Sequence, residues 1–431
     1  MKVYGIEQNE ITTVNFSWVI AGRHLLDNIN KNGVDNLMTD IMMEGTANKT
    51  PEQLEEEIEM LGASINMYTT NESIILRGNT LVRNFDKTMK LVEEILLEPR
   101  WDEEEFSRIK TKTINQIKRS DANPNAVADN VFNKILYGED HIFSYPTSGT
   151  ETSVDAITME DLKAFYTANF SPSISVFNIV GNITKQQVLK NLSGLENHWK
   201  AKNVQIPEFP IANTRDKSSL YFVDIPNAKQ SVINIGYIGL ARTNKDFYPV
   251  EVMNYKLGGS FSGNVNLILR EEKGYTYGAR TSFSGSKTPG TFTASSSVRT
   301  NTTGESVQIF KDEIAKYKEG ISKEDLEFTK NALIKSNARR FETQTSLLGM
   351  LQEISNYNLP SNYIEKEEAT INNMTLEQHK QLANKYLDES KMVYVVVGDA
   401  ATQFEQFQTM GFDEVKLITK DLKEVTLENV N

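Results

Sequence analysis

Hydrophobic side chains recur along the chain with two spacings, and each spacing predicts a different kind of element. Residues 14–20 alternate apolar with small or polar side chains, which is typical of a strand with one buried face. Residues 2–7 also favour a strand, and we expect these two strands to pair as a hairpin. Residues 33–46 instead carry apolar side chains at intervals of three and four up to Gly45, which predicts a helix with one face in a core.

Strand and helix patterns continue to interchange through the first half of the chain. Further strands are predicted at residues 64–68, 73–78 and 174–180. The helices between them begin at capping residues such as Thr50 and Thr158, whose side-chain oxygens can accept from the first free backbone N–H groups. This rhythm predicts the fold class α+β.

The same order of elements occurs a second time later in the chain. Strands predicted at residues 220–224 and 232–238 correspond to the opening pair of strands. A helix at 250–257, followed by Gly258-Gly259-Ser260, corresponds to the helix at 33–46 with its Gly-Thr ending. The chain is therefore predicted to be a duplicated α+β unit.

A linker is predicted between the two copies. Residues 199–218 contain Pro207 and Pro210, many polar side chains and no hydrophobic period. We therefore predict an N-terminal domain at 1–198 and a C-terminal domain at 219–431.

Composition and charge exclude several classes of protein. The chain of 431 residues is 39% hydrophobic and 24% charged, which is typical of a folded protein with a substantial core. Its net charge of −12 argues against a nucleic-acid partner, because phosphate binding needs clustered Lys and Arg side chains. The chain has no cysteine, and therefore no disulfide, thiolate zinc site or cysteine nucleophile.

No membrane span is expected, and the compartment stays open. The most apolar run, residues 392–397, is far shorter than the ~18–20 residues that cross a bilayer, so it predicts a buried strand. The first residues lead directly into a strand pattern, without the zones of a signal peptide. We expect a soluble protein, cytoplasmic as the sequence is written, or periplasmic if the chain is part of a longer secreted protein.

The helix at 33–46 has the spacing of a metal site without its ligands. In H-x-x-E-H enzymes, two histidines four residues apart hold zinc, and a glutamate between them activates a water molecule. Asn36, Thr39 and Asp40 stand in those positions here. Asparagine is a poor zinc ligand, one aspartate cannot hold the ion alone, and threonine is no base near neutral pH. The four histidines show no ligand spacing either: His24, His141, His198 and His379.

Together these features resemble the insulinase/pitrilysin family of zinc metallopeptidases, whose half-length members are similar to the mitochondrial processing peptidase subunits. The family's helix is similar to G-L-A-H-F-L-E-H-M-x-x-x-G-T, and Gly33 to Thr46 matches its length, apolar positions, leading glycine and closing Gly-Thr. The resemblance covers nearly the whole chain. It implies two homologous α/β-sandwich-like domains, each a mostly antiparallel sheet with helices packed on one face.

The resemblance also implies roles for three further residues. Gln116 best matches another zinc ligand of the family, a glutamate on a later helix of the first domain. Arg270 and Tyr277 have the seven-residue spacing of the family's C-terminal substrate motif. In the family this pair binds the peptide and polarises its scissile carbonyl, as fixed donors to a developing oxyanion. The alternative is that Arg270 pairs with a neighbouring glutamate and that Tyr277 is an ordinary strand aromatic.

A loop and two strands have weaker interpretations. Residues 258–263 lack the Gly-Lys-Ser/Thr ending of a phosphate loop, and we interpret them as a helix stop and a turn. The family also adds its substrate to the edge of a sheet, for which the strands at 65–68 and 75–78 are both candidates.

These observations favour a zinc-free half of a two-half metallopeptidase that is inactive alone. The chain would bind unfolded peptide and supply Arg270 and Tyr277 to a zinc-bearing homologous half, either a separate subunit or another part of the same parent polypeptide. No cofactor is expected in this chain, and zinc is expected in the partner. One alternative is a non-catalytic scaffold or core subunit of a complex with the same fold. Another is an independent peptidase with a different metal site, which the lack of clustered His and Glu disfavours.

Overall fold

The chain forms two compact units whose boundaries do not follow the order of the sequence. The computed structural model describes residues 1–210 and 216–429. The first unit consists of Met1–Lys118, Tyr145–Phe209 and Ala338–Ser361. The second consists, as far as it is described, of Arg119–Ser144, Pro210–Asn337 and Asn362–Asn431. Part of the predicted linker, residues 211–215, lies outside the described residues. In the sequence the linker falls between the strands of the two sheets, but one helical segment from each side of it belongs to the other unit.

The first unit contains a five-stranded sheet in which the two opening strands are not neighbours. Its strands are β1 (Lys2–Glu7), β2 (Thr13–Ala21), β3 (Ser64–Thr69), β4 (Ser73–Leu81) and β5 (Ser175–Gly181), in the order β1-β5-β2-β4-β3. β5 pairs in parallel with β1 and antiparallel with β2, so the predicted hairpin is wrong. β5 is buried along nearly its whole length, and a position between two strands gives both of its backbone edges a partner.

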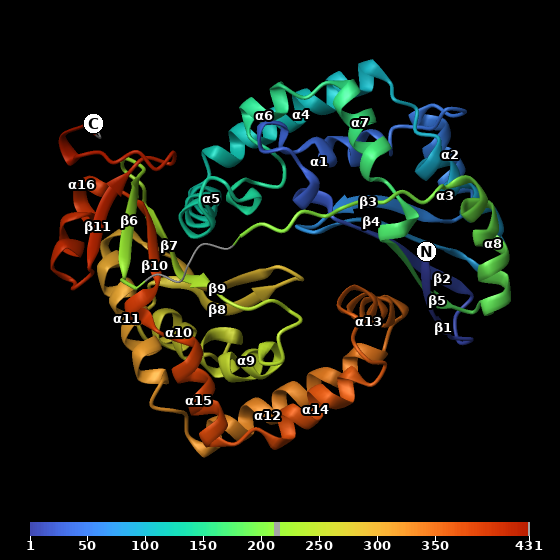
Figure 1. Cartoon of the computed structure of the whole chain (residues 1–431). Coiled ribbons are helices and arrows are strands. Elements are labelled where there is room, and N and C mark those ends of the chain that lie inside the picture. The colour runs from blue at the N-terminus through green and yellow to red at the C-terminus, as the bar shows by residue number, and fades with distance from the viewer. Residues whose placement is uncertain (211–215, 430–431) are drawn as a thin grey trace. The chain divides into compact units, whose positions relative to one another are not determined.

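One face of this sheet packs against helices from the same half of the chain. They are α1 (Val34–Ile41), α2 (Pro51–Met60), α3 (Phe85–Leu97), α4 (Glu103–Asp121), α6 (Glu151–Asp155), α7 (Met159–Asn169) and α8 (Lys185–His198). Phe16 and Trp18 of β2 point into this core, and their ring centres lie 6.2 and 4.2 Å from that of Phe177 in β5. α3 and α8 run side by side over the sheet (Figure 1).

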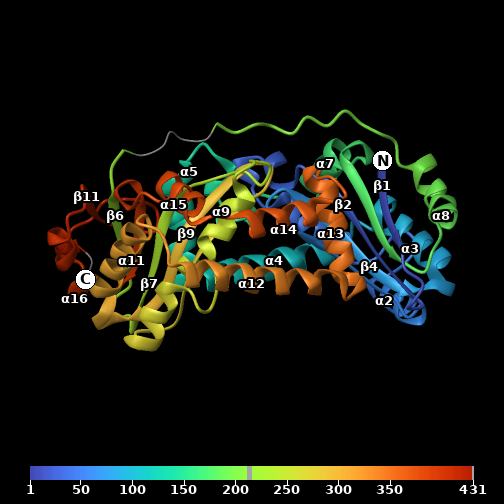
Figure 2. The same cartoon turned by 90° about the horizontal axis from the view of Figure 1, so that it is seen from below.

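The other face is covered by a helix from far along the chain. α13 (Gln344–Tyr357) packs against β2 and β5, as Figures 1 and 2 show. Gln344 Oε1 accepts a hydrogen bond from Asn15 Nδ2 at 2.6 Å, and Gln352 Nε2 donates to Ser17 Oγ at 2.9 Å. The small and polar positions that alternate along β2 therefore bind a helix instead of facing water.

The second unit contains a six-stranded sheet with the same central arrangement. Its strands are β6 (Ser219–Asp224), β7 (Gln230–Ile238), β8 (Thr276–Gly285), β9 (Pro289–Arg299), β10 (Val393–Gly398) and β11 (Glu414–Ile418), in the order β11-β6-β10-β7-β9-β8. β10 lies between β6 and β7 just as β5 lies between β1 and β2. The second predicted hairpin is therefore also wrong, for the same reason.

In the second unit, as in the first, helices cover both faces of the sheet. They are α5 (Pro124–Tyr137), α9 (Phe247–Asn254), α10 (Asn264–Asn266), α11 (Thr303–Tyr317), α12 (Lys323–Ala338), α14 (Tyr363–Asn373), α15 (Leu376–Tyr386) and α16 (Ala400–Gln403). α5, from the first half of the chain, packs against β7 and β10. The buried Asn234 of β7 donates to Asp129 Oδ1 of α5 at 2.8 Å. The α+β class and the duplication are thus confirmed, with the added finding that each sheet has helices on both faces.

In the described part of the chain, residues 1–210 and 216–429, no helix is both long and apolar enough to span a bilayer.

Candidate functional site

The helix that carries the substituted zinc positions is shorter than its sequence pattern indicates. α1 ends at Ile41, and the chain continues in turns to Gly45. Gly33 (φ 95°) and Gly45 (φ 96°) are left-handed, and a Cβ on them would lie 2.9 and 2.5 Å from a backbone oxygen. Thr46 is buried and donates to Glu94 Oε1 at 2.7 Å. These residues fix the path of the backbone, which explains their presence without any metal.

The three substituted positions on α1 have different surroundings. Asn36 is half-buried, whereas Thr39 is 2% exposed and its hydroxyl donates to the carbonyl oxygen one turn earlier, at 2.7 Å. Asp40 is an exposed residue, but neighbouring protein atoms partly bury its carboxyl group and raise its pKa to about 6, against the opposing charge of Lys112. Thr39 is therefore buried in the protein, whereas Asp40 lies at its surface.

The residues at the predicted ligand positions do not fit zinc. Gln116 is exposed on α4, one turn beyond Lys112, which acts on Asp40. Asn36, Thr39 and Gln116 offer amide and hydroxyl groups, which are poor ligands compared with imidazole and carboxylate. Over residues 1–210 and 216–429, no three His, Cys, Asp or Glu side chains gather as a metal would require.

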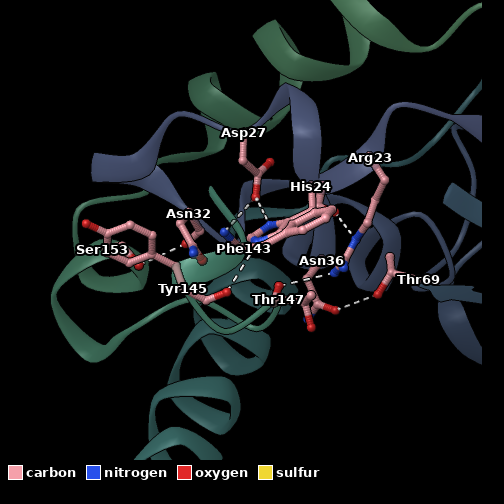
Figure 3. A network of polar contacts seen from close by, with 12 residues as sticks. Arg23, His24, Asp27, Asn32, Asn36, Thr69, Phe143, Tyr145, Thr147 and Ser153 are labelled. Carbon is pink, nitrogen blue, oxygen red and sulfur yellow. Dashed lines mark hydrogen bonds and ion pairs between the residues drawn. The ribbon is translucent and has the colours of Figure 1, made fainter. Parts of the chain in front are cut away.

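A buried cluster of charged side chains lies beside α1, and the sequence did not predict it. Arg23, His24 and Asp27 from the segment before α1 meet Asp35 of α1, and all four are less than a tenth exposed. Arg23 Nε pairs with the Asp35 carboxyl group, while its two other nitrogens donate to backbone oxygens at 2.7 and 3.1 Å (Figure 3). His24 Nδ1 lies 3.5 Å from Asp27 Oδ2. The cluster thus joins α1 to the chain that precedes it.

Burial raises the pKa of both carboxyl groups in this cluster. Burial and the Asp27 carboxylate raise the pKa of Asp35 to about 8, while Arg23 and His24 oppose the shift. Burial also raises the pKa of Asp27 to about 6, although the backbone N–H of Gly33 donates to it at 3.0 Å. Burial therefore favours the protonated form of both carboxyl groups, most strongly that of Asp35, while the Arg23 guanidinium opposes this shift in each.

Replacing Asp35 with asparagine is expected to flatten the pH dependence of stability. The unfolded chain releases this proton near pH 4 and the folded protein near pH 8, so between these values the folded protein binds more protons. Stability due to Asp35 is thus complete below about pH 4 and falls as pH rises to 8, by roughly 1 kcal/mol per unit. Urea unfolding at pH 5, 6.5 and 8 measures the difference.

The exposed Asp155 in the same unit supplies the matched control for this measurement. Asp155→Asn is expected to follow the parent at all three pH values, whereas the Asp35→Asn variant gains on the parent as pH rises. A parent and an Asp35→Asn variant with parallel pH profiles would show that the cluster does not hold the extra proton.

In the second unit, Arg270 is held at the surface by two neighbours. It lies in the π-helical turn Leu267–Glu272, and its Nη1 is 3.4 Å from Glu271 Oε1. Its guanidinium carbon lies 4.4 Å from the centre of the Phe261 ring. The glutamate pairing considered as an alternative is therefore present. The Glu271 side chain is 54% exposed, so the pair contributes little to stability.

Tyr277 points into solvent because of a bulge in β8. The register between β8 and β9 shifts between Thr276 and Ala279, and Tyr277 is 92% exposed. Thr276 Oγ1 accepts from the Gly278 N–H at 3.0 Å and donates to Ser297 O at 2.7 Å, which fixes the bulge. Bulges often re-aim a side chain near functional sites. Packing within this unit does not account for so exposed a tyrosine.

The sequence did not single out Phe261 or Asn266, and the Asn266 side chain holds this region together. Asn266 is 2% exposed, and its Nδ2 donates to Phe261 O at 2.7 Å while its Oδ1 accepts from Ala279 N at 3.0 Å. One buried amide therefore connects the loop that carries Phe261 to the strand that carries Tyr277. The available sequence signal was a phenylalanine among Gly and Ser residues in a segment that otherwise has the composition of a turn.

The structure distinguishes the two candidate edges for an added peptide strand. β4 pairs with β2 on one side and β3 on the other, whereas β3 lies at the end of the sheet. Thr69, the last residue of β3, donates to Asn36 Oδ1 at 3.2 Å (Figure 3). Of the two candidates, the strand at 65–68 therefore has the free edge, and it lies beside α1.

Comparisons with known sequences match both parts of the chain. Residues 4–145 match the profile described as Insulinase (Peptidase family M16), and residues 156–333 match the profile described as Peptidase M16 inactive domain. The chain is 24% identical over 322 residues to "Uncharacterized zinc protease YmxG" of Bacillus subtilis, spanning 73% of this chain and 76% of that protein. It is 20% identical over 397 residues to "Non-peptidase homolog YmxG" of Helicobacter pylori, spanning 91% of each.

A comparison with solved structures gives the same fold. A crystal structure titled as the peptidase M16 inactive domain from Pseudomonas fluorescens superposes with a TM-score of 0.87 at 24% identity, covering 93% of this chain and 96% of that one. At this level of identity the match concerns the fold alone.

Proposed function

The chain belongs to the insulinase family, peptidase family M16, and from that premise we propose that it is the zinc-free half of a two-half peptidase. Its first half keeps the family's helix but has Asn36, Thr39 and Asp40 where metal ligands and base would stand. The partner is a homologous half that carries H-x-x-E-H and holds zinc, as a separate subunit or within the same polypeptide. The substrate is an unfolded peptide.

The main support for this proposal is the exposure of Arg270 and Tyr277 at the surface of the second unit. Tyr277 is 92% exposed and turned outward by a bulge, and the Arg270 side chain is 34% exposed. A guanidinium and a phenol that the fold holds at the surface are suitable fixed donors to a carbonyl oxygen that gains negative charge. In this proposal the pair completes the partner's active site.

The free edge of β3 is the proposed place for the peptide backbone. An extended peptide that adds to a sheet edge gains main-chain hydrogen bonds that do not depend on its sequence. The hydrogen bond from Thr69 to Asn36 keeps α1 beside this edge. This arrangement suits a protein that takes many different unfolded segments.

Removing the two donors is expected to lower peptidase activity in the mixture with the zinc-bearing half. Arg270→Ala should lower kcat/KM by about 10- to 100-fold, because one fixed donor to an oxyanion is lost. Tyr277→Phe should lower it by about 3- to 10-fold, because a neutral phenol is a weaker donor than a guanidinium. The measurement is the cleavage rate of an unstructured fluorogenic peptide at saturating zinc-bearing half.

Matched controls separate this effect from damage to the fold. Arg83→Ala removes an exposed arginine of the first unit and should leave kcat/KM unchanged. The Tyr277→Phe variant should unfold within about 0.5 kcal/mol of the parent, because its side chain is exposed. Parent-level activity with both Arg270→Ala and Tyr277→Phe would exclude the proposed role of the pair.

A second candidate is a non-catalytic scaffold subunit that uses the same fold. The likeness to a protein named a non-peptidase homolog favours it. A scaffold should bind its partner equally well with or without Arg270, and the complex should show no chelator-sensitive cleavage. Zinc analysis and cleavage assays of the purified complex distinguish the two candidates.

A further inference from the structure

Phe261 is an exposed aromatic ring in an otherwise polar turn. It is 70% exposed, so burial of the ring adds little to the stability of the second unit. The centre of its ring nevertheless lies 4.4 Å from the Arg270 guanidinium carbon, well within the distance at which a cation is attracted to a ring face. The ring therefore contacts Arg270 but is not part of the hydrophobic core.

The backbone around Phe261 is held rigidly. The side chain of the buried Asn266 donates a hydrogen bond of 2.7 Å to the Phe261 carbonyl oxygen. A Cβ on Gly258 would lie 2.6 Å from the backbone nitrogen of Thr281, and a Cβ on Gly263 would lie 2.6 Å from Gly258 Cα. The turn can thus follow this path only with glycine at both positions, and the path places the ring beside Arg270.

Arg270 has little else to hold its orientation. Its Glu271 partner is adjacent in sequence, is 54% exposed and lies 3.4 Å away, beyond a short charge-assisted hydrogen bond. A long side chain with one such contact samples many rotamers, and ordering it costs free energy when a ligand binds. A ring packed against the guanidinium reduces that cost, and it does not compete for the guanidinium N–H groups because it is no hydrogen-bond acceptor of their in-plane kind.

We propose that Phe261 is a positioning residue that orients the Arg270 guanidinium for an oxygen acceptor of the bound peptide. This inference rests on the proposed function of Arg270 as a donor to the substrate. Phe261 acts through Arg270, so its removal matters only while Arg270 is present. The role belongs to the aromatic ring, and tyrosine at this position preserves it.

The first test reports on the stacking itself and uses the full chain alone. The Nε–Hε NMR signal of Arg270 is assigned by its loss in Arg270→Ala. We expect the ring current to shift this signal upfield in the parent and in Phe261→Tyr. In Phe261→Ala the signal should remain but without the upfield shift. A signal at the same position in the parent and in Phe261→Ala would overturn the stacked arrangement.

The second test is a double-mutant cycle in the complex with the zinc-bearing half. Phe261→Ala should lower kcat/KM for an unstructured fluorogenic peptide by about 3- to 30-fold, Phe261→Tyr should restore it, and Phe261→Ala should have no further effect in the Arg270→Ala background. Phe328→Ala is the matched control, because Phe328 is 46% exposed in the same unit with the Lys256 ammonium 5.6 Å from its ring centre. It should leave kcat/KM unchanged.

The outcomes separate this inference from the proposed function. If Arg270→Ala lowers activity but Phe261→Ala does not, or if the two losses multiply, the positioning role is overturned while the role of Arg270 stands. If Arg270→Ala leaves activity unchanged, the proposed function fails and the positioning role fails with it, whatever the NMR signal shows of the stacking.

Discussion

A fragment that ends at residue 205 is expected to show no cooperative unfolding transition of its own, and so is the complementary fragment 206–431. The first fragment keeps β1 to β5 but loses α13, which covers the second face of their sheet. The second keeps β6 to β11 but loses α5, which has the same role there. Neither half of the sequence contains a complete unit, although each contains a complete sheet.

The missing contacts are large compared with the stability of a domain. Leu347, Leu348 and Leu351 of α13 are at most 8% exposed and form a cluster with Val180 of β5. Burying three such side chains contributes about 5–9 kcal/mol. Typical domains are stable by only about 5–15 kcal/mol. Asn15 would in addition lose its hydrogen-bond partner on α13.

Near-UV circular dichroism and thermal unfolding of each fragment test this expectation. Co-expression of the two fragments should restore a folded complex, because all the elements are then present. A fragment 1–205 joined to residues 338–361 through a flexible linker should recover a transition that fragment 1–205 lacks. A single sharp transition in fragment 1–205 alone would show that α13 is dispensable for the first unit.

Replacing Arg23 with methionine is expected to destabilise the first unit by about 3–5 kcal/mol near pH 8. Arg23 is 1% exposed and provides the guanidinium that faces the buried carboxyl groups of Asp27 and Asp35. Without it, these groups must keep an unpaired buried charge or take up another proton, and either change costs free energy. Two backbone carbonyl groups, of Thr70 and Thr147, would also lose a donor.

The pH dependence of this loss identifies its cause. At pH 5 both carboxyl groups bind a proton more readily, so removal of Arg23 should cost less than at pH 8. The double variant Arg23→Met/Asp35→Asn should recover part of the stability, whereas Arg83→Met, at an exposed arginine, should cost little. Urea unfolding followed by tryptophan fluorescence gives each value. A loss below about 1 kcal/mol at pH 8 for the single variant would mean that the cluster is not a structural ion-pair network.

Much of the secondary structure follows from local patterns in the sequence. The alternation of apolar residues at Val14, Phe16 and Trp18 predicts β2, because strands place every second side chain on one face. Thr50 and Thr158 predict two helix starts, and both make the expected capping box. These features need only neighbours within a few residues, so they can be predicted without the fold.

The neighbours of each strand and the far faces of the sheets were not predictable in this way. β5 lies between β1 and β2 although more than 150 residues of chain separate it from β2. Asn15 and Ser17 look like surface positions in the sequence, and only the packing of α13 shows that they bind a helix. Long-range pairing depends on which arrangement buries the most apolar surface, and no local spacing encodes that arrangement.

The same division applies to the candidate site. By itself, the sequence placed Asn36, Thr39, Asp40 and Gln116 at the family's ligand and base positions. These residue types predict no zinc site, because ligand chemistry depends on residue type. The sequence also showed that Arg270 and Tyr277 have the spacing of the family's substrate motif. The tertiary structure decided that Arg23 and Asp35 share a buried cluster, that Tyr277 faces solvent and that the Arg270 guanidinium lies over the Phe261 ring. Such contacts and exposures depend on burial, on a bulge and on a glycine turn, which exist only once the chain has folded.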